Sequence, residues 1–297
     1  MDEPFFSEKV AVRQSFDAAA HHYDQSAVLQ REVANRLDER FDYVKLQPTR
    51  LLDLGSGTGY GRDLLSKRFP DVQVIELDLA LSMLQVAKSK ASFWAKGWSV
   101  LRGVQRTQVC ADAENLPFAG AVFDVVWSNL TIQWCNTPDS AFADAWRVLK
   151  PGGLFTFSTL GPDTLMELRS AFQTVDDQPH VNRFIDMHDI GDALVKAGFG
   201  APVIDMERIT MQYDTVKDVM LDLKGIGAHN VASGRRRGLL GKQAWQKVVG
   251  SYEQFRCNGK LPASYEVIYG HAWKPESASK KVLQDGRQVI DFFPKQG

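Results

Sequence analysis

A glycine-rich segment that follows a short apolar run is the clearest candidate ligand site in this sequence. The run, Arg50–Leu54, contains the carboxylate of Asp53, and Gly55, Gly57 and Gly59 follow it at every second position. Glycine lets the backbone adopt positive φ angles and pass close to a bound molecule. We therefore expect a tight loop that holds a polar ligand, with a carboxylate at its base.

The spacing of these glycines excludes two common phosphate-binding loops. A dinucleotide loop has the pattern G-x-G-x-x-G, which would require glycine where the chain has Tyr60 or Arg62. A P-loop ends in Lys followed by Ser or Thr, and this segment has no such ending. The loop is therefore expected to serve a different ligand.

A second candidate carboxylate stands at the end of the next apolar run. Residues 72–77 form that run, and Asp78 follows it directly before a helical pattern. In α/β nucleotide-binding proteins, a carboxylate at this edge of the sheet accepts hydrogen bonds from the ribose hydroxyls. Glu76 is the alternative acceptor, but Asp78 lies nearer the start of the expected helix. We therefore predict a nucleoside-binding site at Asp78.

Taken together, these features resemble the class I methyltransferases, which use S-adenosyl-L-methionine. The glycine spacing resembles their motif I, residues 111–118 resemble their adenine-binding segment, and residues 123–130 resemble their motif IV. The resemblance implies that Asp53 lies near the methionine end of the cofactor, that Asp112 accepts from the adenine amino group, and that the N–H of Ala113 donates to the ring. It implies further cofactor contacts from Gly55, Ser56, Gly57, Gly59, Asp78, Leu79 and Asn129.

Two of these carboxylates also have purely structural explanations. Asp53 can cap the turn that follows it, and Asp112 can be an ordinary turn residue. A carboxylate within an apolar strand needs a partner, however, and acidic residues at three successive strand ends favour one shared site. The segment Leu-Ala-Leu-Ser at 79–82 departs from the Ser-Pro that often follows the second acidic residue in the family. This departure alters the helix start and keeps the carboxylate.

Narrower segments of the chain resemble the BioC family of malonyl-acyl-carrier-protein O-methyltransferases, over about residues 13–273. They are Ser15-Phe16-Asp17 with Tyr23-Asp24, Trp-Ser-Asn-Leu-Thr-Ile-Gln-Trp-Cys at 127–135, His-Val-Asn-Arg-Phe at 180–184, Leu-Lys-Gly-Ile-Gly-Ala at 223–228 and Leu-Pro-Ala-Ser-Tyr at 261–265. The resemblance implies methyl transfer from S-adenosyl-L-methionine to the free carboxylate of a malonyl thioester of acyl-carrier protein or coenzyme A, in biotin synthesis. Methylation neutralises the malonyl carboxylate, so that the fatty-acid machinery can elongate the acyl chain.

The implied reaction needs little acid–base chemistry. The malonyl carboxylate is already ionised at pH 7, so the enzyme must mainly align the reacting atoms and exclude water. We therefore expect polar and cationic anchors rather than a His–Asp pair, and the candidates are Lys224, Tyr23 and Arg183. Each has an alternative role: a solvated helix face for Lys224, helix packing for Tyr23 and a salt bridge for Arg183.

Three further residues are expected to line the substrate channel, namely Gln133, Trp134 and His229, with His180 as an additional candidate. Trp134 is equally compatible with a position in the hydrophobic core. The histidines show no metal-ligand spacing and the three cysteines contain no CxxC pair. We therefore expect no metal site and a reducing compartment.

The elements that must position these residues alternate between strands and helices. Apolar runs predict strands at 50–54, 72–77, 107–110, 122–128 and 153–159, and helical patterns predict helices at 59–68, 80–92 and 139–149. Such alternation predicts an α/β fold, here a Rossmann-like class I methyltransferase sheet with helices on both faces and a helical lid insertion. Pro151-Gly152-Gly153 predicts a turn before the last of these strands.

The remaining segments complete a division into four parts. Two helices are expected within 8–45, a helix at 188–197, and strands at 202–211 and 265–273. We divide the chain into an N-terminal helical cap (1–47), a cofactor-binding α/β core (48–213 and 261–275), a helical lid insertion over the carboxyl edge of the sheet (214–260) and a tail (276–297).

Composition limits the possible partners. The 297-residue chain has a formal net charge of −1, so bulk charge predicts no affinity for nucleic acid or membranes. The basic run Arg235-Arg236-Arg237 with Lys242 is either a solvated loop or a docking surface for an acidic carrier protein. No secretory signal or membrane-length apolar run is evident, so we expect a cytoplasmic enzyme.

The alternatives to a malonyl-thioester methyltransferase are a methyltransferase for another small carboxylate or a quinone, and an assembly factor that keeps the methyltransferase fold.

Overall fold

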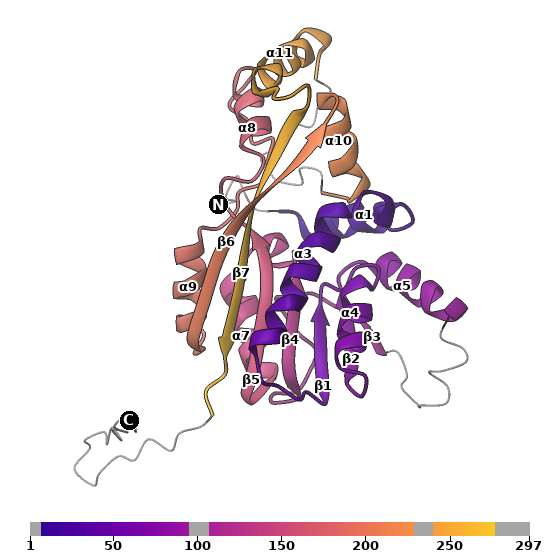
Figure 1. The fold of residues 1–297 in the computed structure, drawn as a ribbon, viewed down its shortest axis with the longest axis vertical. Coiled ribbons are helices and arrows are strands. Elements are labelled where there is room, and N and C mark those ends of the chain that lie inside the picture. Colours follow the sequence, from indigo (N-terminus) through magenta and orange to yellow (C-terminus); the bar gives the residue numbers. More distant parts are fainter. Residues whose placement is uncertain (1–6, 95–106, 229–239, 277–297) are drawn as a thin grey trace, which may run out of the picture.

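A seven-stranded sheet forms the centre of the computed structural model, which describes residues 7–94, 107–228 and 240–276 (Figure 1). The strands lie in the order β3-β2-β1-β4-β5-β7-β6. The first five in sequence are parallel to one another, and β7 is antiparallel to both β5 and β6. This sheet confirms the predicted Rossmann-like fold. The strand bounds are β1 (Arg50–Leu54), β2 (Gln73–Asp78), β3 (Thr107–Cys110), β4 (Phe123–Asn129), β5 (Leu149–Leu160), β6 (Gly200–Tyr213) and β7 (Leu261–Trp273).

The strand order reverses next to β1. The chain proceeds outward from β1 through β2 to β3, and then returns to place β4 on the other side of β1. At such a reversal the loops that leave neighbouring strands diverge and open a crevice at the carboxyl ends of the strands. The segments after β1, β2, β3 and β4 therefore meet at one edge.

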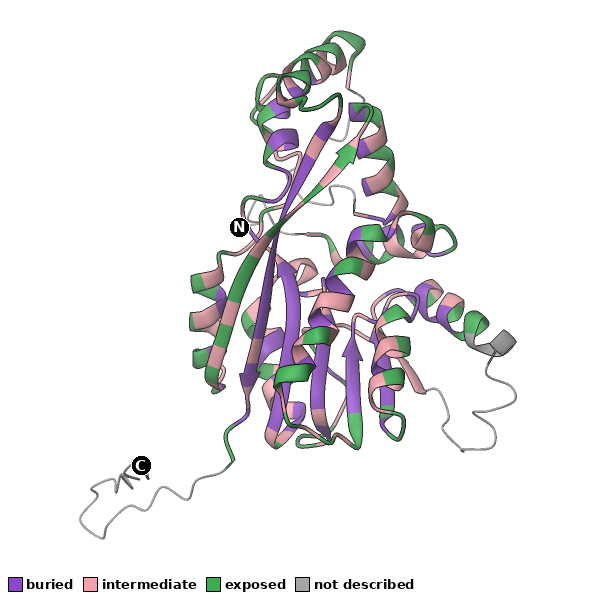
Figure 2. Ribbon diagram, in the orientation of Figure 1, coloured by how far each residue is buried: buried purple, intermediate pink, exposed green. Residues whose placement is uncertain are grey.

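Alternate residues of the inner strands contribute to two separate cores, because successive side chains of a strand point to opposite faces. Leu51 and Val125 belong to the core on one face, whereas Leu52 and Val126 belong to the core on the other. β1 and β4 are buried along nearly their whole length (Figure 2). Burial on both faces explains why these strands are continuous apolar runs in the sequence.

Helices cover both faces of the sheet. On one face α3 contacts β4 and β5 and α4 contacts β2, and on the other α7 contacts β5 and α9 contacts β6. Within the described ranges, no helix combines the length and apolar character needed to cross a bilayer. The α-helices are α1 (Lys9–Ala19), α2 (Tyr23–Ser26), α3 (Val28–Glu39), α4 (Tyr60–Arg68), α5 (Leu81–Trp94), α7 (Pro138–Val148), α8 (Met166–Gln173), α9 (Met187–Lys196), α10 (Val216–Gly225) and α11 (Lys242–Tyr252). Short 3-10 helices are η1 (Arg40–Tyr43), η2 (Ile132–Trp134) and η3 (Glu253–Phe255).

The last two strands extend past the end of β5. β7 pairs with β5 only between Val267 and Trp273, whereas its pairing with β6 continues to Leu261. The projecting part of this two-stranded ribbon lies among α8, α10 and α11 (Figure 1). α8 packs against α11 and β7, and α10 contacts α2. These helices therefore stand above the carboxyl edge of the sheet.

β6 is an edge strand whose outer residues carry charge. Its residues alternate between intermediate and exposed (Figure 2). Glu207 pairs with Arg36 of α3 at 2.5 Å, and Asp205 pairs with Arg40 of η1 at 2.9 Å. These ion pairs fasten the helix that covers one face of the sheet to its edge strand.

The elements differ from the sequence-based expectation in three places. Pro151-Gly152-Gly153, predicted as a turn, lies inside β5, where the pairing jumps from Phe123–Leu149 to Val125–Leu154 and Gly152 has φ +77°. The extra residues bulge out of the ladder without ending the strand. α8 was not predicted; it follows Leu165, which has φ +55° and supplies no side-chain cap. The short α2 is a third helix in the segment 8–45, where two were predicted, and it lies between α1 and α3.

Replacing Gly270 with Ala is expected to lower the free energy of unfolding by about 1–3 kcal/mol, because the buried strand pair leaves no room for a methyl group. A Cβ at Gly270 would lie 2.4 Å from the ring of Phe157. Gly250 in α11 is the matched control, since a Cβ there meets no atom within 4 Å. Gly250→Ala should raise the free energy of unfolding by about 0.5–1 kcal/mol, because alanine has the higher helix propensity. Urea denaturation measures both, and equal effects of the two variants would contradict this account of β5–β7 packing.

Candidate active site

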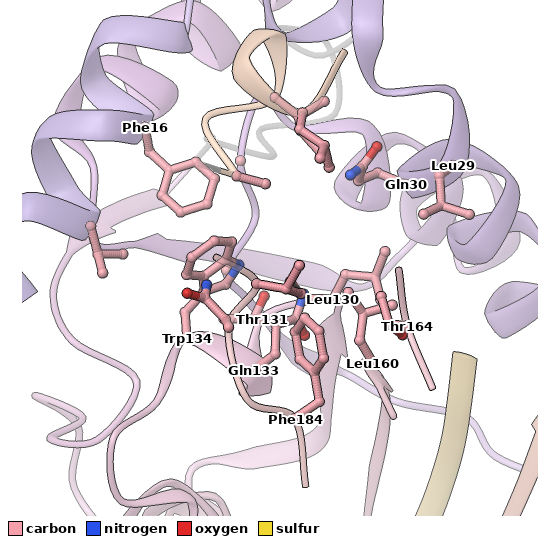
Figure 3. A pocket seen from close by; sticks show the side chains of 18 of the residues that line it. Phe16, Leu29, Gln30, Leu130, Thr131, Gln133, Trp134, Leu160, Thr164 and Phe184 are labelled. Atoms are coloured by element: carbon pink, nitrogen blue, oxygen red, sulfur yellow. Dashed lines mark hydrogen bonds between the residues drawn. The ribbon is translucent and has the colours of Figure 1, made fainter. Parts of the chain in front are cut away.

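A cavity of about 530 Å³ opens at the carboxyl ends of the strands. The glycine loop, β2 and the segments after β3 and β4 form its base, and α1, α8, α10 and α11 form its other walls. Phe16 of α1 lies next to Trp134 in the wall of this main cavity, which Gln133 and Phe184 also line (Figure 3). Segments from distant parts of the chain thus enclose one space.

The glycine loop is held against the end of β2. The N–H groups of Gly55 and Ser56 donate to the carbonyl of Leu77 at 2.7 and 3.0 Å. Gly55 has φ +78°, and a Cβ there would lie 1.9 Å from Oγ1 of Thr131, so glycine is required. Gly57 has φ +53°, and a Cβ placed on it would meet no atom within 4 Å. The backbone of Gly57 is therefore open to a ligand in the main cavity.

Asp78 lies directly beside this loop. Its Oδ2 accepts from the N–H of Gly57 and its Oδ1 from the N–H of Ala80, both at 2.8 Å. Burial raises the pKa of Asp78 to about 6, because it outweighs the stabilisation of the charged form by these two donors. The alternative carboxylate, Glu76, is fully buried within the sheet, where Gln108 lies 3.5 Å away. Asp78 lines the main cavity and Glu76 does not.

Asp112 and Ala113 line the same cavity at the end of β3. Oδ1 of Asp112 accepts from the N–H of Glu114 and from Nζ of Lys9, both at 3.0 Å. Leu79, which follows Asp78, is also part of the lining. The structure therefore brings together the residues that the sequence assigned to the nucleoside.

Asp53 lies on the other side of the glycine loop. It is 2% exposed and borders a small cavity of about 50 Å³ that Ser56 and Asn129 also line. Tyr23, Gly55, Gly57 and Asn129 line both cavities. Gly59 has φ +89° and stands at the start of α4. The two cavities are therefore adjacent, and the glycine loop forms part of the wall of each.

Asn129 and Gln133 are both held by hydrogen bonds. The amide of Asn129 donates to the carbonyl of Gln30 at 3.0 Å and accepts from Ser158 Oγ at 2.8 Å. Gln133 Nε2 donates to the carbonyl of Leu130 at 2.7 Å, and its Oε1 accepts from Thr159 Oγ1 at 3.2 Å. These contacts fix both side chains in the cavity wall.

Trp134 lines the main cavity and packs edge-on against Phe16, with ring centroids 5.1 Å apart. This contact joins η2 to α1. Its predicted place beside the substrate channel is compatible with this position, and a role in binding remains a prediction.

The three predicted anchors have different positions. Tyr23 lines both cavities, and Lys224 is exposed on α10 but lines the main cavity. Burial, together with the charges of Asp78 and Asp24, raises the pKa of Tyr23 well above its usual range, so its hydroxyl stays protonated. Arg183 is exposed and does not line the main cavity.

Two predicted features lie outside the described residues. They are His229 and the basic run Arg235-Arg236-Arg237. Lys242, the fourth member of the basic cluster, is the exposed first residue of α11.

His180, an additional candidate from the sequence, lines the main cavity and is held by Asp176. Nε2 of His180 lies 2.7 Å from Oδ1 of Asp176, and the His180 ring stacks on Phe172 with centroids 4.1 Å apart. The pair turns the other ring nitrogen away from Asp176. The sequence had named His180 as a candidate for the channel lining, but Asp176 was not predicted as its partner.

The glycines of the Leu-Lys-Gly-Ile-Gly-Ala segment (223–228) allow close contact with the N-terminal helices. A Cβ at Gly225 would lie 2.3 Å from Oγ of Ser26. Gly227 has φ +70°, and its carbonyl accepts from Oγ of Ser15 at 2.6 Å. Small residues therefore let the end of α10 lie against α1 and α2, which places Lys224 at the cavity.

Comparison with known proteins yields close relatives along the whole chain. A methyltransferase domain family model matches residues 52–157. A malonyl-[acyl-carrier protein] O-methyltransferase of Laribacter hongkongensis is 53% identical over 294 residues, which cover 99% of each chain. A protein of the same name from Gallionella capsiferriformans is 55% identical over 286 residues, covering 96% of this chain and 97% of the relative.

Solved structures are similar in fold at much lower identity. A putative methyltransferase from Bacillus halodurans has a TM-score of 0.57 and 19% identity, covering 82% of this chain and 98% of that chain. The YcgJ protein of Bacillus subtilis has the same TM-score and identity, covering 82% of this chain and 99% of that chain. These similarities establish the fold.

Replacing Asp78 with Asn is expected to raise the melting temperature at pH 8 and to change it little at pH 4. The folded-state pKa of about 6 lies above the ordinary value of 3.8, so protonation of Asp78 stabilises the fold below about pH 4, and this contribution is lost as pH rises through about 6. Thermal unfolding at both pH values tests this. Asp63→Asn, on the exposed surface of α4, controls for the loss of one charge, and a lower melting temperature of Asp78→Asn at pH 8 would be inconsistent with a buried, destabilising carboxylate.

Proposed function

The chain belongs to the malonyl-[acyl-carrier protein] O-methyltransferase family, and on that basis we propose that it methylates the free carboxylate of a malonyl group carried on acyl-carrier protein. The methyl donor is S-adenosyl-L-methionine, and the product is the methyl ester used in biotin synthesis. The observation that carries the proposal is that one continuous cavity is lined by Asp78 and Asp112 at the sheet edge and also by Tyr23 of α2 and Lys224 of α10.

The residues at the sheet edge fit the cofactor. In this proposal Asp78 accepts from the ribose hydroxyls and Asp112 from the adenine amino group, and the N–H of Ala113 donates to the ring. The open backbone face of Gly57 leaves room for the ligand beside Asp78. The small cavity bordered by Asp53 and shared with the main cavity suits the methionine end.

The cofactor supplies an electrophilic methyl group on a sulfonium sulfur. A malonyl carboxylate oxygen forms the new bond to that methyl carbon as the carbon–sulfur bond breaks, and S-adenosylhomocysteine leaves. No proton moves, since the carboxylate is ionised at pH 7. The protein must therefore hold oxygen, carbon and sulfur in line and exclude water.

Tyr23 and Lys224 are the groups best placed to orient the malonyl carboxylate. Tyr23 lies beside both Asp78 and the boundary of the two cavities, and its raised pKa keeps the hydroxyl available as a donor. The ammonium of Lys224 attracts a carboxylate as a point charge. His180, oriented by Asp176, is a third polar group in the same wall. Arg183 is the weakest of the predicted anchors because it does not line this cavity.

The far end of the main cavity suits a thioester arm. Leu168 and Phe172 of α8, Leu223 of α10 and Trp245 of α11 line it, and Tyr265 of β7 supplies a hydroxyl. Apolar walls exclude water from the transfer site and can contact the methylene groups of a pantetheine chain. Coenzyme A and acyl-carrier protein share that chain, and the names of the relatives support the carrier protein as the proposed substrate.

Incubation with S-adenosyl-L-methionine and malonyl-carrier protein should add the mass of one methyl group in place of a proton, as read by intact mass spectrometry. Acetyl-carrier protein is the control, because it offers the same arm without a free carboxylate. Malonyl-coenzyme A in a parallel reaction compares the two carriers. Unchanged malonyl-carrier protein, together with methylation of another acceptor, would refute the proposed substrate.

Replacing Lys224 with Ala should lower kcat/KM for malonyl-carrier protein by about tenfold, or about 1.4 kcal/mol, because an exposed cation loses its attraction for the substrate carboxylate. Affinity for S-adenosylhomocysteine, measured by calorimetry, should not change. Lys217→Ala is the matched control, since Lys217 is an exposed lysine of the same helix that does not line the cavity. Loss of cofactor affinity in Lys224→Ala, or an equal effect of Lys217→Ala, would show that the assigned role is wrong.

A further inference from the structure

Lys9, the first residue of α1, contacts the carboxylate assigned to adenine in the lining of the cavity. Its Nζ lies 3.0 Å from Oδ1 of Asp112 and forms an ion pair with Glu114. The contact joins residues that are 103 positions apart in the sequence. Lys9 and Asp112 both line the main cavity, so the contact lies within the ligand site.

The hydrogen bonds of Asp112 are distributed unevenly between its two oxygens. Lys9 Nζ and the N–H of Glu114 both donate to Oδ1, each at 3.0 Å. Among the hydrogen bonds between described residues, none ends on Oδ2. Fixing one oxygen of a carboxylate fixes the direction of the other. Oδ2 is thus left as the acceptor for a ligand amino group.

Lys9 is held in place by the backbone around it. The N–H of Ser7 donates to Oδ1 of Asn136, and Nδ2 of Asn136 donates to the carbonyl of Ser7, both at 2.9 Å. Farther along α1, Asp17 accepts from the N–H of Ser82 at 2.8 Å. The helix is therefore tied to the sheet edge near both ends, and Lys9 is positioned before any ligand binds.

The charge of Lys9 offsets two neighbouring carboxylates. Glu114 is fixed in turn, since it accepts from the N–H of Thr137 at 2.5 Å. Burial lowers the pKa of Lys9, but its hydrogen bonds with Glu114 and Asp112 outweigh that effect, and the pKa lies above its usual range. Without this cation, Asp112 and Glu114 would repel each other and Asp112 would lose one of its two donors.

We propose that Lys9 is a positioning residue for cofactor recognition: it holds Asp112 with Oδ2 turned toward the adenine amino group and thereby sets the preference for adenine. The inference rests on the proposed cofactor site. Lys9 itself does not contact the transferred methyl group. Its effect is expected in the choice of base.

The test compares two ligands that differ at one position of the base. S-adenosylhomocysteine carries a 6-amino donor, and S-inosylhomocysteine carries a carbonyl oxygen there, which a carboxylate acceptor repels. Calorimetry on the full chain should show that Lys9→Met weakens S-adenosylhomocysteine binding about tenfold, the effect of one charge-assisted hydrogen bond. Binding of the inosyl analogue should change little, so the preference for adenine falls.

Matched variants distinguish a positioning role of Lys9 from a nonspecific loss of ligand affinity. Lys9→Arg should restore the preference, because it keeps a cationic donor. Arg13→Met changes a half-exposed cation of the same helix, which pairs with Asp17 instead, and should behave as the wild type. A Lys9→Met variant that keeps the adenine preference, or that weakens both ligands equally, overturns the proposal.

Asp112→Asn tests the underlying site separately. If Asp112→Asn changes neither affinity nor base preference, the adenine assignment of Asp112 fails whatever Lys9 does. If Asp112→Asn loses the preference while Lys9→Met retains it, only the role of Lys9 is overturned. The double variant should be no weaker than Asp112→Asn alone, because the two residues act through one contact.

Discussion

The backbone contact between the glycine loop and the end of β2 is the constraint on which the site depends. One carbonyl, that of Leu77, accepts from two successive N–H groups of the loop, and the next residue, Asp78, accepts from a third. Gly55 meets Thr131 so closely that any side chain would force the β4 segment away. The positions of the loop, of Asp78 and of the wall after β4 therefore depend on one another, and a change in one displaces the others.

The sequence predicted those parts of the molecule whose signals are local. Buried parallel strands are continuous apolar runs, and Asp53, Asp78 and Asp112 follow from their positions within or just after such runs. The bulge in β5 escaped prediction because Pro151-Gly152-Gly153 is typical of a turn and only pairing with β4 keeps it in a strand. α8 escaped because it lacks a capping residue and is stabilised by packing against α11 and β7.

The contacts that complete the site join distant segments and leave no periodic pattern. Lys9 with Asp112, and Ser15 with Gly227, are each separated by more than a hundred residues. The glycines of the 223–228 segment were recognised by resemblance, but their reason, close approach to Ser26 and α1, required the structure. Polar groups line the cavity at the sheet edge and apolar side chains line it above that edge. In the proposed reaction, the charged acceptor and the sulfonium would meet near Tyr23, between these two regions.

The ion pairs along β6 have a consequence for the behaviour of the protein in a crowded cell. An edge strand offers unpaired backbone groups on which another chain can build a continuous sheet. Glu207 and Asp205, paired with Arg36 and Arg40, place fixed charges along this edge. A strand added there would have to bury or separate these charges. The helix that covers one face of the sheet thus also protects the molecule from edge-to-edge aggregation.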